Sequence, residues 1–527
     1  MTPSSHAVNP FAAVDLAALL ANRARQRGNH PFLIWSPFDG PTQTWSYAHF
    51  AETVARLAGG MAARGVKPGD RVLVQLENCP EALLTLFACA HLGAIHVPVN
   101  AMAAGPELAW YASFTGAVGA VTQPRLAAAI ASHCPDLRWL AITETDAGSP
   151  AAANTLPERA QSFKALYGEA LPARAPDPDA PALIMFTSGT TSRPKGVLWT
   201  HANALWGARL GALQQGLRAD DVYQLFLPLF HVVALSWSFL PALWAGATVV
   251  LQPRFSASRY WPTALEFGAT VGSQVIFTSR VLSQQPVPAN HRFRQWTDAL
   301  CPPEFEALFG LRFIGGWGMT EVIAQAIVGD PWQPQPAGSI GRPSLGYAVH
   351  VLGDDGKPVS PGQPGDLLIG GIRGRSLFKE YYMNPQANAE AFNEHGLFRT
   401  GDRVIVHENG FIQFSERAKD VIKVGGEGVS PAEIERVVLE VQGIQEAAVV
   451  AHQDKAYGEI PVVFVVLAPD PHADRTDQVQ ARVIEHCRRS LARFKVPREV
   501  IVLPELPRIN FGKIAKVKLR EWLQSRK

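Results

Sequence analysis

The chain has 527 residues, of which 47% are hydrophobic and 18% are charged, and its formal net charge is +2. This length predicts two or more domains, and the composition is typical of a soluble globular protein. The near-neutral charge gives no reason to expect nucleic acid or an anionic membrane as a partner. The five cysteines are scattered, which argues against a zinc site or a disulfide framework and favours a reducing cytoplasm.

The N-terminal part of the chain alternates helix and strand patterns. Leucine and alanine at helical spacing predict a helix over residues 48–63. Apolar runs then predict strands over 72–76 and 95–99, with a helix over 80–92 between them. Strand, helix and strand in alternation indicate a parallel sheet with covered faces. Residues 148–181 are rich in Ala and Pro and are expected to form a surface connector.

A short apolar strand, residues 182–186, opens into a loop rich in glycine and hydroxyl groups, residues 187–196. Its backbone N–H groups and hydroxyls are suited to donate to phosphate oxygens, and Lys195 adds a full charge. The spacing differs from that of a Walker loop, so the sequence predicts another kind of nucleotide site. The candidate phosphate ligands are Thr187, Ser188, Gly189, Thr190, Thr191 and Lys195.

The segment between Asp221 and Arg254 contains no Asp, Glu, Lys or Arg, and by length alone it could cross a bilayer. Pro228 and Pro241 interrupt it, and its end, residues 247–251, has the pattern of a strand. We therefore expect a buried helix followed by a strand and no membrane span.

The composition changes after about residue 417 and predicts a small α+β unit. Ser430 is a plausible N-cap with Glu433 three residues on, the pattern of a capping box. The predicted elements are a helix over 430–441, strands over 447–451 and 462–467, and a basic helix over 478–492.

Six motifs in order along the chain make the interpretation sharper. They are residues 187–196, 227–231, 317–321 and 398–402, then Arg417, and finally residues 512–513. Together they resemble the motifs of the adenylate-forming enzymes, which comprise acyl-CoA synthetases, peptide-synthetase adenylation domains and beetle luciferases. Further stretches resemble the crotonobetaine/carnitine-CoA ligase branch: residues 77–81, 97–101 and 378–387, and Ser192.

The resemblance implies a fold of class α/β. A large N-terminal domain of parallel and mixed sheets wrapped by helices would span residues 1–418. A small mobile α+β domain would span residues 419–527, with a hinge at Lys419. It also implies an ATP-dependent carboxylic acid:CoA ligase, which forms an acyl-adenylate and pyrophosphate, then an acyl-CoA thioester and AMP. ATP, Mg²⁺, coenzyme A and a small-molecule carboxylic acid are the implied cofactor and substrates, and a homodimer is left open.

The resemblance also assigns roles around the nucleotide. The loop would grip the β- and γ-phosphates, Thr320 would donate to the α-phosphate, and Glu321 would hold Mg²⁺. Trp317 stands where the family usually has a tyrosine stacked on adenine, next to Gly318. Asp402 would accept hydrogen bonds from the ribose hydroxyls, and Arg417 would contact the ribose or a phosphate.

The remaining roles concern the acid and the thiol. Lys513 resembles the lysine that bridges carboxylate and phosphate during adenylation. Rotation at Lys419 would then withdraw it and bring Gly425 and Gly426 into the thiol channel. His231 resembles the gate between the acyl site and that channel. The candidate acyl-pocket residues are Val232, Val233, Trp237, Gly315 and Gly316.

No Asp or Glu lies between residues 230 and 254, which disfavours an α-amino acid because its ammonium would be buried without a partner. A quaternary ammonium group would need an acid or an aromatic cage, and no acid is evident. We therefore expect an uncharged, modest-sized acyl or aryl acid. Three alternatives stay open: transfer of the acyl group to an amine or a carrier protein, a luciferase-like oxygenase, and a non-catalytic acyl or nucleotide sensor.

Overall fold

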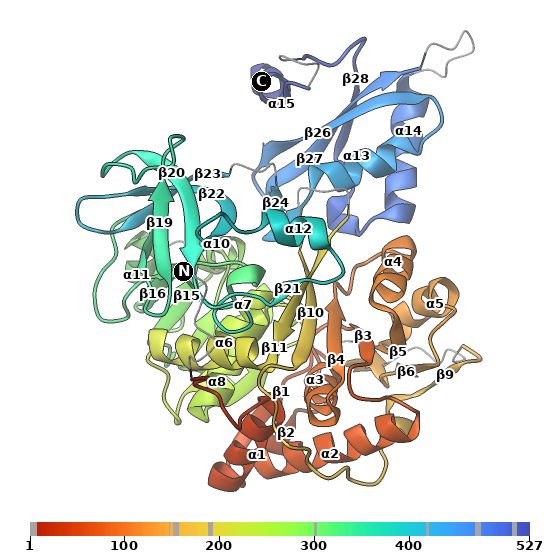
Figure 1. Ribbon diagram of the computed structural model, residues 1–527, viewed down its shortest axis with the longest axis vertical. Helices are drawn as coiled ribbons and strands as arrows, with labels where there is room; N and C mark the ends of the chain where they lie inside the picture. The colour runs from red at the N-terminus through yellow and green to blue at the C-terminus, as the bar shows by residue number, and fades with distance from the viewer. Residues whose placement is uncertain are drawn as a thin grey trace. The chain divides into compact units, whose positions relative to one another are not determined.

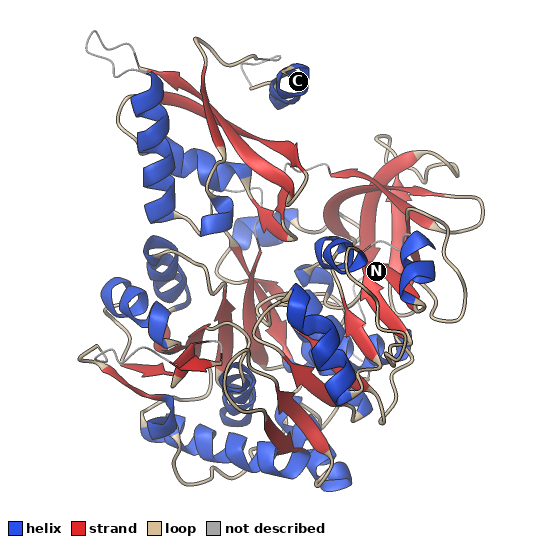
Figure 2. Ribbon diagram, turned by 180° about the vertical axis from the view of Figure 1, so that it is seen from behind, coloured by secondary structure: helices blue, strands red, loops and turns tan. Residues whose placement is uncertain are grey.

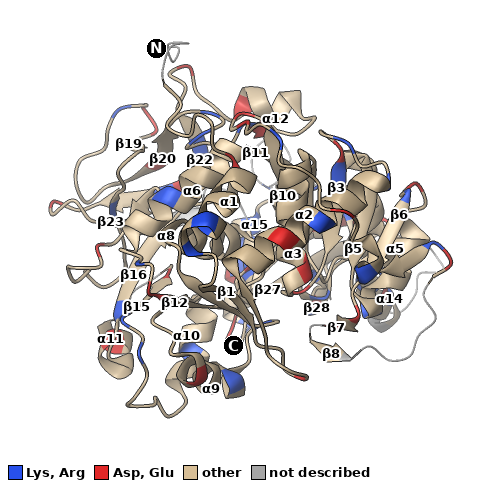
Figure 3. Ribbon diagram, turned by 90° about the horizontal axis from the view of Figure 1, so that it is seen from below, with Lys and Arg blue, Asp and Glu red and all other residues tan. Residues whose placement is uncertain are grey.

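A computed structural model describes residues 8–146, 148–150, 157–187, 193–299, 303–417, 421–468, 476–508 and 514–526. The chain divides into two compact units (Figure 1). The first consists of Met1–Ala101, Ala112–Met185 and Gly196–Glu416, and the second of Met102–Tyr111, Phe186–Lys195 and Arg417–Lys527. In the view of Figure 3 basic and acidic residues are interspersed among the described elements, which agrees with the small net charge.

An eight-stranded sheet in the first unit contains the predicted strand–helix–strand alternation. Its order is β21-β11-β10-β4-β3-β5-β6-β9, and the pairs from β10 to β9 are parallel. Helix α3 (Pro80–Leu92) and strand β4 (Ile95–Val99) have the predicted bounds. The other strands are β3 (Arg71–Gln75), β5 (Ala117–Thr122), β6 (Trp139–Ile142), β9 (Ala160–Ser162), β10 (Pro181–Thr187), β11 (Lys195–Thr200) and β21 (Glu380–Tyr381).

A thirteen-stranded sheet forms the rest of the first unit, in the order β19-β20-β22-β23-β18-β17-β16-β15-β14-β12-β13-β1-β2. Its pairs from β16 to β1 are parallel. The pairs β1–β2, β16–β17, β17–β18, β18–β23, β19–β20 and β20–β22 are antiparallel. The strands are β1 (Pro31–Trp35), β2 (Gln43–Ser46), β12 (Val222–Leu225), β13 (Thr248–Leu251), β14 (Val271–Ser273), β15 (Gln295–Asp298), β16 (Arg312–Trp317), β17 (Ile327–Val328), β18 (Ser339–Pro343), β19 (Ala348–Leu352), β20 (Pro364–Gly370), β22 (Phe398–Val406) and β23 (Ile412–Arg417). Strands β7 (Thr145–Asp146) and β8 (Ser149–Pro150) form a separate pair.

Helices cover these sheets, and phenylalanine rings join the layers. Phe50 of α2 contacts Phe32 of β1 and Phe87 of α3, with ring centroids 5.0 and 6.0 Å apart, and Phe239 closes the cluster. Buried aromatic rings of this kind supply much of the stabilisation of a core. The helices are α1 (Leu16–Arg27), α2 (Tyr47–Ala63), α5 (Pro124–His133), η1 (Phe163–Leu166), α6 (His201–Gln214), α7 (Val232–Ala234), η2 (Leu235–Phe239), α8 (Leu240–Ala245), α9 (Ala257–Phe267), α10 (Ile276–Ser283), α11 (Pro303–Phe309), η3 (Thr320–Val322) and α12 (Pro385–Glu390), while α4 (Gly105–Thr115) belongs to both units.

The uncharged segment after Asp221 folds as β12, α7, η2, α8 and β13. The expected buried helix and strand are thus confirmed, although the helical part is divided and η2 is a π-helix. No helix within the described ranges is both long enough and apolar enough to cross a membrane.

The second unit contains a five-stranded sheet with helices on both faces (Figure 2). Helices α13 and α14 share one apolar core with Val449 and Val463, while α15 packs on the other face, where the rings of Phe464 and Trp522 are 5.6 Å apart. The elements are β24 (Ile422–Val424), β25 (Glu427–Val429), α13 (Pro431–Leu439), β26 (Ile444–Asp454), β27 (Gly458–Leu467), α14 (Thr476–Ser490), η4 (Arg493–Lys495), β28 (Glu499–Val502) and α15 (Lys516–Ser525).

The predicted capping box at Ser430 is wrong. Ser430 is the N-cap of α13, but its side chain makes no capping hydrogen bond. Glu433 is buried instead and accepts from Lys495 Nζ at 2.9 Å, and Lys495 also contacts Glu107 of α4 at 2.5 Å. An unpaired buried ammonium costs more free energy than an uncapped N–H at a helix end. The Glu433 carboxylate therefore pairs with the distant Lys495 and does not cap α13.

Candidate active site

Trp317 and Asp402, predicted for adenine and ribose, are brought together in the first unit. The indole Nε1 of Trp317, at the end of β16, donates to Asp402 Oδ2 of β22 at 2.9 Å, and both residues are buried. The backbone N–H of Asp402 donates to Thr400 Oγ1 at 3.0 Å, and that hydroxyl donates to the carbonyl of Leu367 at 2.7 Å. The N–H of Trp317 therefore orients the Asp402 carboxylate, and the stacking of its ring on adenine stays a prediction.

Glu321, the predicted metal ligand, lies in η3 and is held by Tyr381. The tyrosine hydroxyl donates to Glu321 Oε1 at 2.9 Å, and both side chains are buried. Burial, and then the adjacent Glu321 charge, raise the pKa of Tyr381, so its hydroxyl stays protonated and keeps donating. Tyr381 was not predicted from the sequence as part of the site. The available signal was the 378–387 stretch, which was used only to place the branch.

Strand β11, which leaves the phosphate loop, is fixed to the same region. Val197 of β11 pairs with Tyr381, and the backbone N–H of Tyr382 donates to the carbonyl of Gly196 at 2.7 Å. Trp199 Nε1 donates to the carbonyl of Thr320 at 2.9 Å. The strand after the loop and the Thr320–Glu321 segment are therefore positioned together.

Parts of the predicted phosphate loop lie outside the described residues, namely Ser188, Gly189, Thr190 and Thr191. Thr187 ends β10 and Lys195 begins β11, both half-buried, in the second unit. Their assignment to phosphate stays a prediction.

The candidate acyl-pocket residues lie on α7, η2 and β16. His231 is the N-cap of α7, and its ring centroid is 4.6 Å from that of Phe230. Val232 is buried, and Val233 and Trp237 are half-buried. Trp237 Nε1 donates to the carbonyl of Ile323 at 3.0 Å, which ties this region to η3. The π-helix that carries Trp237 is of a kind often found at functional sites.

Close packing explains why glycine is needed beside Trp237. A Cβ on Gly318 would lie 2.6 Å from the Trp237 ring and 2.8 Å from the carbonyl of Ala324. A Cβ on Gly316 would lie 1.9 Å from Gln325 Nε2, and the neighbouring Gly315 is also buried in β16. The glycines predicted for the nucleotide and acyl sites thus allow the indole and the strand to come together.

The backbone after η3 is strained. Ile323 has φ = +69°, which is rare for a β-branched residue. The hydroxyl of Tyr347 fixes the residues on both sides, since it donates to the carbonyl of Val322 and accepts from the backbone N–H of Ala324. Strain of this kind persists where the surroundings impose it, and it clusters at functional sites.

Asn78, in the 77–81 stretch that resembles the carnitine-CoA ligase branch, was not predicted to be part of the site. Its side chain is 2% exposed, Nδ2 donates to the carbonyl of Leu227 at 2.9 Å, and Oδ1 accepts from the backbone N–H of Leu229 at 2.9 Å. Asn78 therefore fixes the backbone of the segment that leads to His231. Its neighbours in the sequence do not indicate these distant partners.

The glycines predicted for the thiol channel belong to the second unit. Gly425 and Gly426 form the turn between β24 and β25, with φ of +58° and +95°. Lys419 and Lys513 lie outside the described residues. Arg417 is the last residue of β23, and its side chain is not among the described parts. The roles of these residues stay predictions.

The comparisons with known proteins identify the class. The family model described as AMP-binding enzyme matches residues 20–382, and the model of the AMP-binding enzyme C-terminal domain matches residues 433–513. The chain therefore belongs to the AMP-binding enzyme family.

Individual relatives narrow this class. A crotonobetaine/carnitine–CoA ligase of Salmonella agona (strain SL483) is 33% identical over 94% of this chain and 96% of the relative. A double mutant of o-succinylbenzoate CoA synthetase (MenE) from Bacillus subtilis has a TM-score of 0.82 at 26% identity, and covers 95% of this chain and 98% of that one. A fatty acyl CoA synthetase of Mycobacterium tuberculosis has a TM-score of 0.68 at 29% identity, with 97% and 99% covered. The protein is an AMP-forming acyl-CoA synthetase, as its motifs indicated.

Proposed function

We propose that this synthetase joins an uncharged carboxylic acid of modest size to coenzyme A through an acyl-adenylate. The observation that supports it best is the shared anchoring of Glu321, Thr320 and the strand after the phosphate loop. In adenylation a carboxylate oxygen of the acid attacks the α-phosphorus of ATP, and pyrophosphate leaves. Catalysis of such a transfer depends on positioning and on charge neutralisation, which fixed groups supply.

The proposed nucleotide roles are those that the family resemblance assigns to each residue. Asp402, oriented by Trp317, would accept the ribose hydroxyls, and Thr320 would donate to the α-phosphate. The loop with Lys195 would bind the leaving pyrophosphate. Arg417 would assist at the ribose or a phosphate.

Mg²⁺ fits the region around Glu321. No group of three or more His, Cys, Asp and Glu side chains suited to a metal occurs in the described part of the chain. Mg²⁺ beside nucleotides is usually held by one or two carboxylates plus phosphate oxygens, so a single fixed carboxylate suits it. When bound, the ion would neutralise phosphate charge, and Tyr381 would keep Glu321 oriented for it.

The thioester half-reaction depends on the second domain, residues 419–527. Lys513 would neutralise the reacting carboxylate and phosphate during adenylation and then leave by rotation at Lys419. The Gly425–Gly426 turn has no side chains, so it would let the pantetheine arm pass close to the backbone. The thiolate then attacks the acyl carbonyl carbon, a C–S bond forms, and AMP leaves with the oxygen.

Apart from its reacting carboxylate, the acid is proposed to be uncharged, because the candidate acyl-pocket residues carry no charge. Val232, Val233, Trp237, Gly315 and Gly316 offer no carboxylate for an ammonium group and no cation for a second carboxylate. Burying an unpaired charge would cost several kcal/mol, about the free energy that binding an acid supplies.

The cysteines support a cytoplasmic location. Cys79, Cys89, Cys134 and Cys487 are free thiols and all are buried. Unpaired cysteines are typical of a reducing compartment. A homodimer is the proposed assembly that sedimentation would test.

The test is a screen with ATP, Mg²⁺ and short, branched, aromatic and betaine-type acids, each with CoA or with an amine. We expect pyrophosphate release and a CoA thioester with uncharged acids, and loss of adenylation in Lys513→Ala. Pyrophosphate release without any thioester would favour an amine or a carrier protein as acceptor. No pyrophosphate release with any acid would contradict the ligase and favour a sensor.

A further inference from the structure

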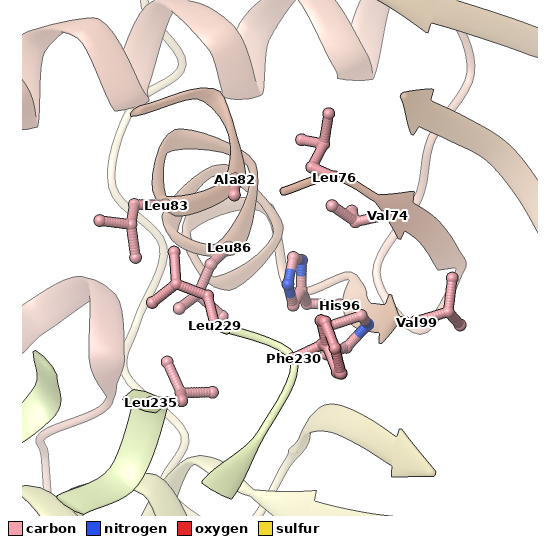
Figure 4. Close-up of a pocket in the computed structure, with 11 residues that line it drawn as sticks. Val74, Leu76, Ala82, Leu83, Leu86, His96, Val99, Leu229, Phe230 and Leu235 are labelled. Carbon is pink, nitrogen blue, oxygen red and sulfur yellow. The ribbon is translucent and has the colours of Figure 1, made fainter. Parts of the chain in front are cut away.

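A cavity of the first unit lies around His96, between α3, β3 and β4 (Figure 4). Its other lining residues are apolar, and His96 Nδ1 has no hydrogen-bond partner among the described residues. With open solvent left out, the cavity has room for about one water molecule. It is therefore too small for a substrate, and the features that indicate a partner lie on the surface of the unit.

Three of the most exposed apolar side chains in the first unit lie around the C-terminal end of α6. Leu213 of α6, Trp332 and Leu345 are 68%, 74% and 87% exposed, and we call these three side chains the α6 patch. Single exposed apolar residues are common on protein surfaces, whereas a group of large ones marks an interaction site.

Contacts of α6 bring the members of the patch together. Gly216, just after the helix, faces the Trp332 ring, since a Cβ on this glycine would lie 3.6 Å from Trp332 Cζ2. Gln214 Nε2 donates to Ser344 Oγ at 2.6 Å, and Ser344 directly precedes Leu345. The segments that carry Trp332 and Leu345 are therefore both held beside the end of α6.

Two residues of opposite charge flank the α6 patch. Arg209 lies one helical turn before Leu213 on the same face of α6. Asp330 lies beside Trp332, whose backbone N–H donates to Asp330 Oδ1 at 2.7 Å. Both residues are exposed, and neither forms an ion pair with another residue in the described part of the chain.

This pair of charges favours a second copy of the chain as the partner. In a dimer with two-fold symmetry the same surface meets itself, so it must carry groups that complement one another. An arginine and an aspartate on one surface meet this condition, because each can lie opposite the other in the second copy. A surface built for a different protein has no need of both signs of charge.

The apolar area of the patch agrees with what a dimer needs. An aromatic side chain buries about 150–250 Å² in an interface or core, so the exposed tryptophan and two leucines together offer roughly 400 Å². A stable interface takes about 800 Å² from each partner, and about 60% of that area is apolar. The patch would therefore supply most of the apolar area of such an interface.

We infer that the α6 patch is the contact surface between two copies of this chain related by a two-fold axis. Arg209 of each copy pairs with Asp330 of the other. The tryptophan and the leucines form the apolar centre of the interface, and the two ion pairs lie at its rim. The inference rests on the proposed homodimer, to which it assigns a surface, and it is independent of the proposed reaction.

The first test is sedimentation of the full chain over a range of concentrations. The wild type should form a dimer, and Leu345→Glu should weaken its association at least about 100-fold, because two carboxylates would be buried without partners. Leu439→Glu is the matched control: it makes the same change on an exposed leucine of the second unit and should leave the dimer intact. The melting temperature of each variant shows that it is folded.

The outcomes separate the surface from the assembly and from the reaction. A dimer that Leu345→Glu does not weaken would overturn the α6 patch as the interface and leave the homodimer standing. A wild type that stays monomeric would overturn both, and the patch would then belong to a different protein partner. The proposed ligase fails separately, through the absence of pyrophosphate release with every acid.

The second test exchanges the charges between copies. Arg209→Glu or Asp330→Arg places like charges opposite each other in both pairs, so each variant alone should associate about tenfold more weakly than the wild type. An equimolar mixture of the two variants should regain the wild-type affinity, because both pairs of the mixed dimer again have opposite charges. A repulsion within one chain would not be relieved by mixing. A mixture as weak as the separate variants would overturn the pairing and the two-fold arrangement.

Discussion

Removing one hydroxyl from Tyr381 tests the proposed phosphate and metal side of the site most directly. In Tyr381→Phe the ring remains, but the donor to Glu321 Oε1 at 2.9 Å is lost. A hydrogen bond to a charged group contributes about 1.5–3 kcal/mol, and each 1.4 kcal/mol corresponds to about a tenfold change. Both residues are almost fully buried, at 6% and 3% exposed, so water cannot replace the donor. We therefore expect adenylation to weaken about 10- to 100-fold, the range seen when residues that orient metal ligands are removed.

The assay is pyrophosphate release as a function of Mg²⁺ concentration at saturating acid. In Tyr381→Phe, the Mg²⁺ concentration that gives the half-maximal rate should rise, and added Mg²⁺ should restore part of the lost rate. Tyr382→Phe is the matched control, because it makes the same chemical change one residue on, where the hydroxyl contacts no polar group of the described residues. If the two variants show the same Mg²⁺ dependence, Glu321 does not act as proposed, or Tyr381 does not orient it.

Three further predictions concern other parts of the chain. Trp317→Phe keeps an aromatic ring but loses the N–H to Asp402, so AMP should bind about tenfold more weakly by calorimetry, and unchanged affinity would contradict the role of that bond. Lys495→Met should destabilise the second unit by about 3–5 kcal/mol in denaturant unfolding, because it leaves Glu433 buried and uncompensated. Burial acts to lower the pKa of Lys495, but the nearby Glu433 charge outweighs this and raises the pKa above its usual 10.5, so Lys495 stays charged and keeps its ion pairs between pH 6 and 9 in the wild type. His96→Leu should raise the melting temperature, because an unpaired polar atom is replaced by an apolar group, and a lower value would mean that His96 has a structural partner.

The elements that the sequence predicted best are those whose limits are set locally. Helix α3 begins at Pro80, which suits the first position of a helix, and ends before Gly93, which has φ = +86°. Strand β4 is uniformly apolar apart from His96 and is bounded by turn residues. Glu433 had an equally clear local pattern, yet the capping box did not form because Lys495, 62 residues away, takes its carboxylate.

The same physical distinction separates the site residues that were predicted from those that were missed. Trp317, Glu321 and Asp402 stand in short runs whose spacing is itself informative, so the motifs could be identified without a structure. Tyr381 and Asn78 act through partners 60 and 149 residues away, and nothing in their neighbours specifies those partners. Both bind backbone or side-chain groups of a motif rather than the substrates, which is a task that many residue types could perform. His96 differs again, since its burial without a hydrogen bond has no counterpart in the sequence and depends on β3, β4 and α3 closing around it. Residues that stand in contiguous motifs were thus accessible to sequence reasoning, whereas the positions of Tyr381, Asn78 and His96 emerge only from the packing of distant segments.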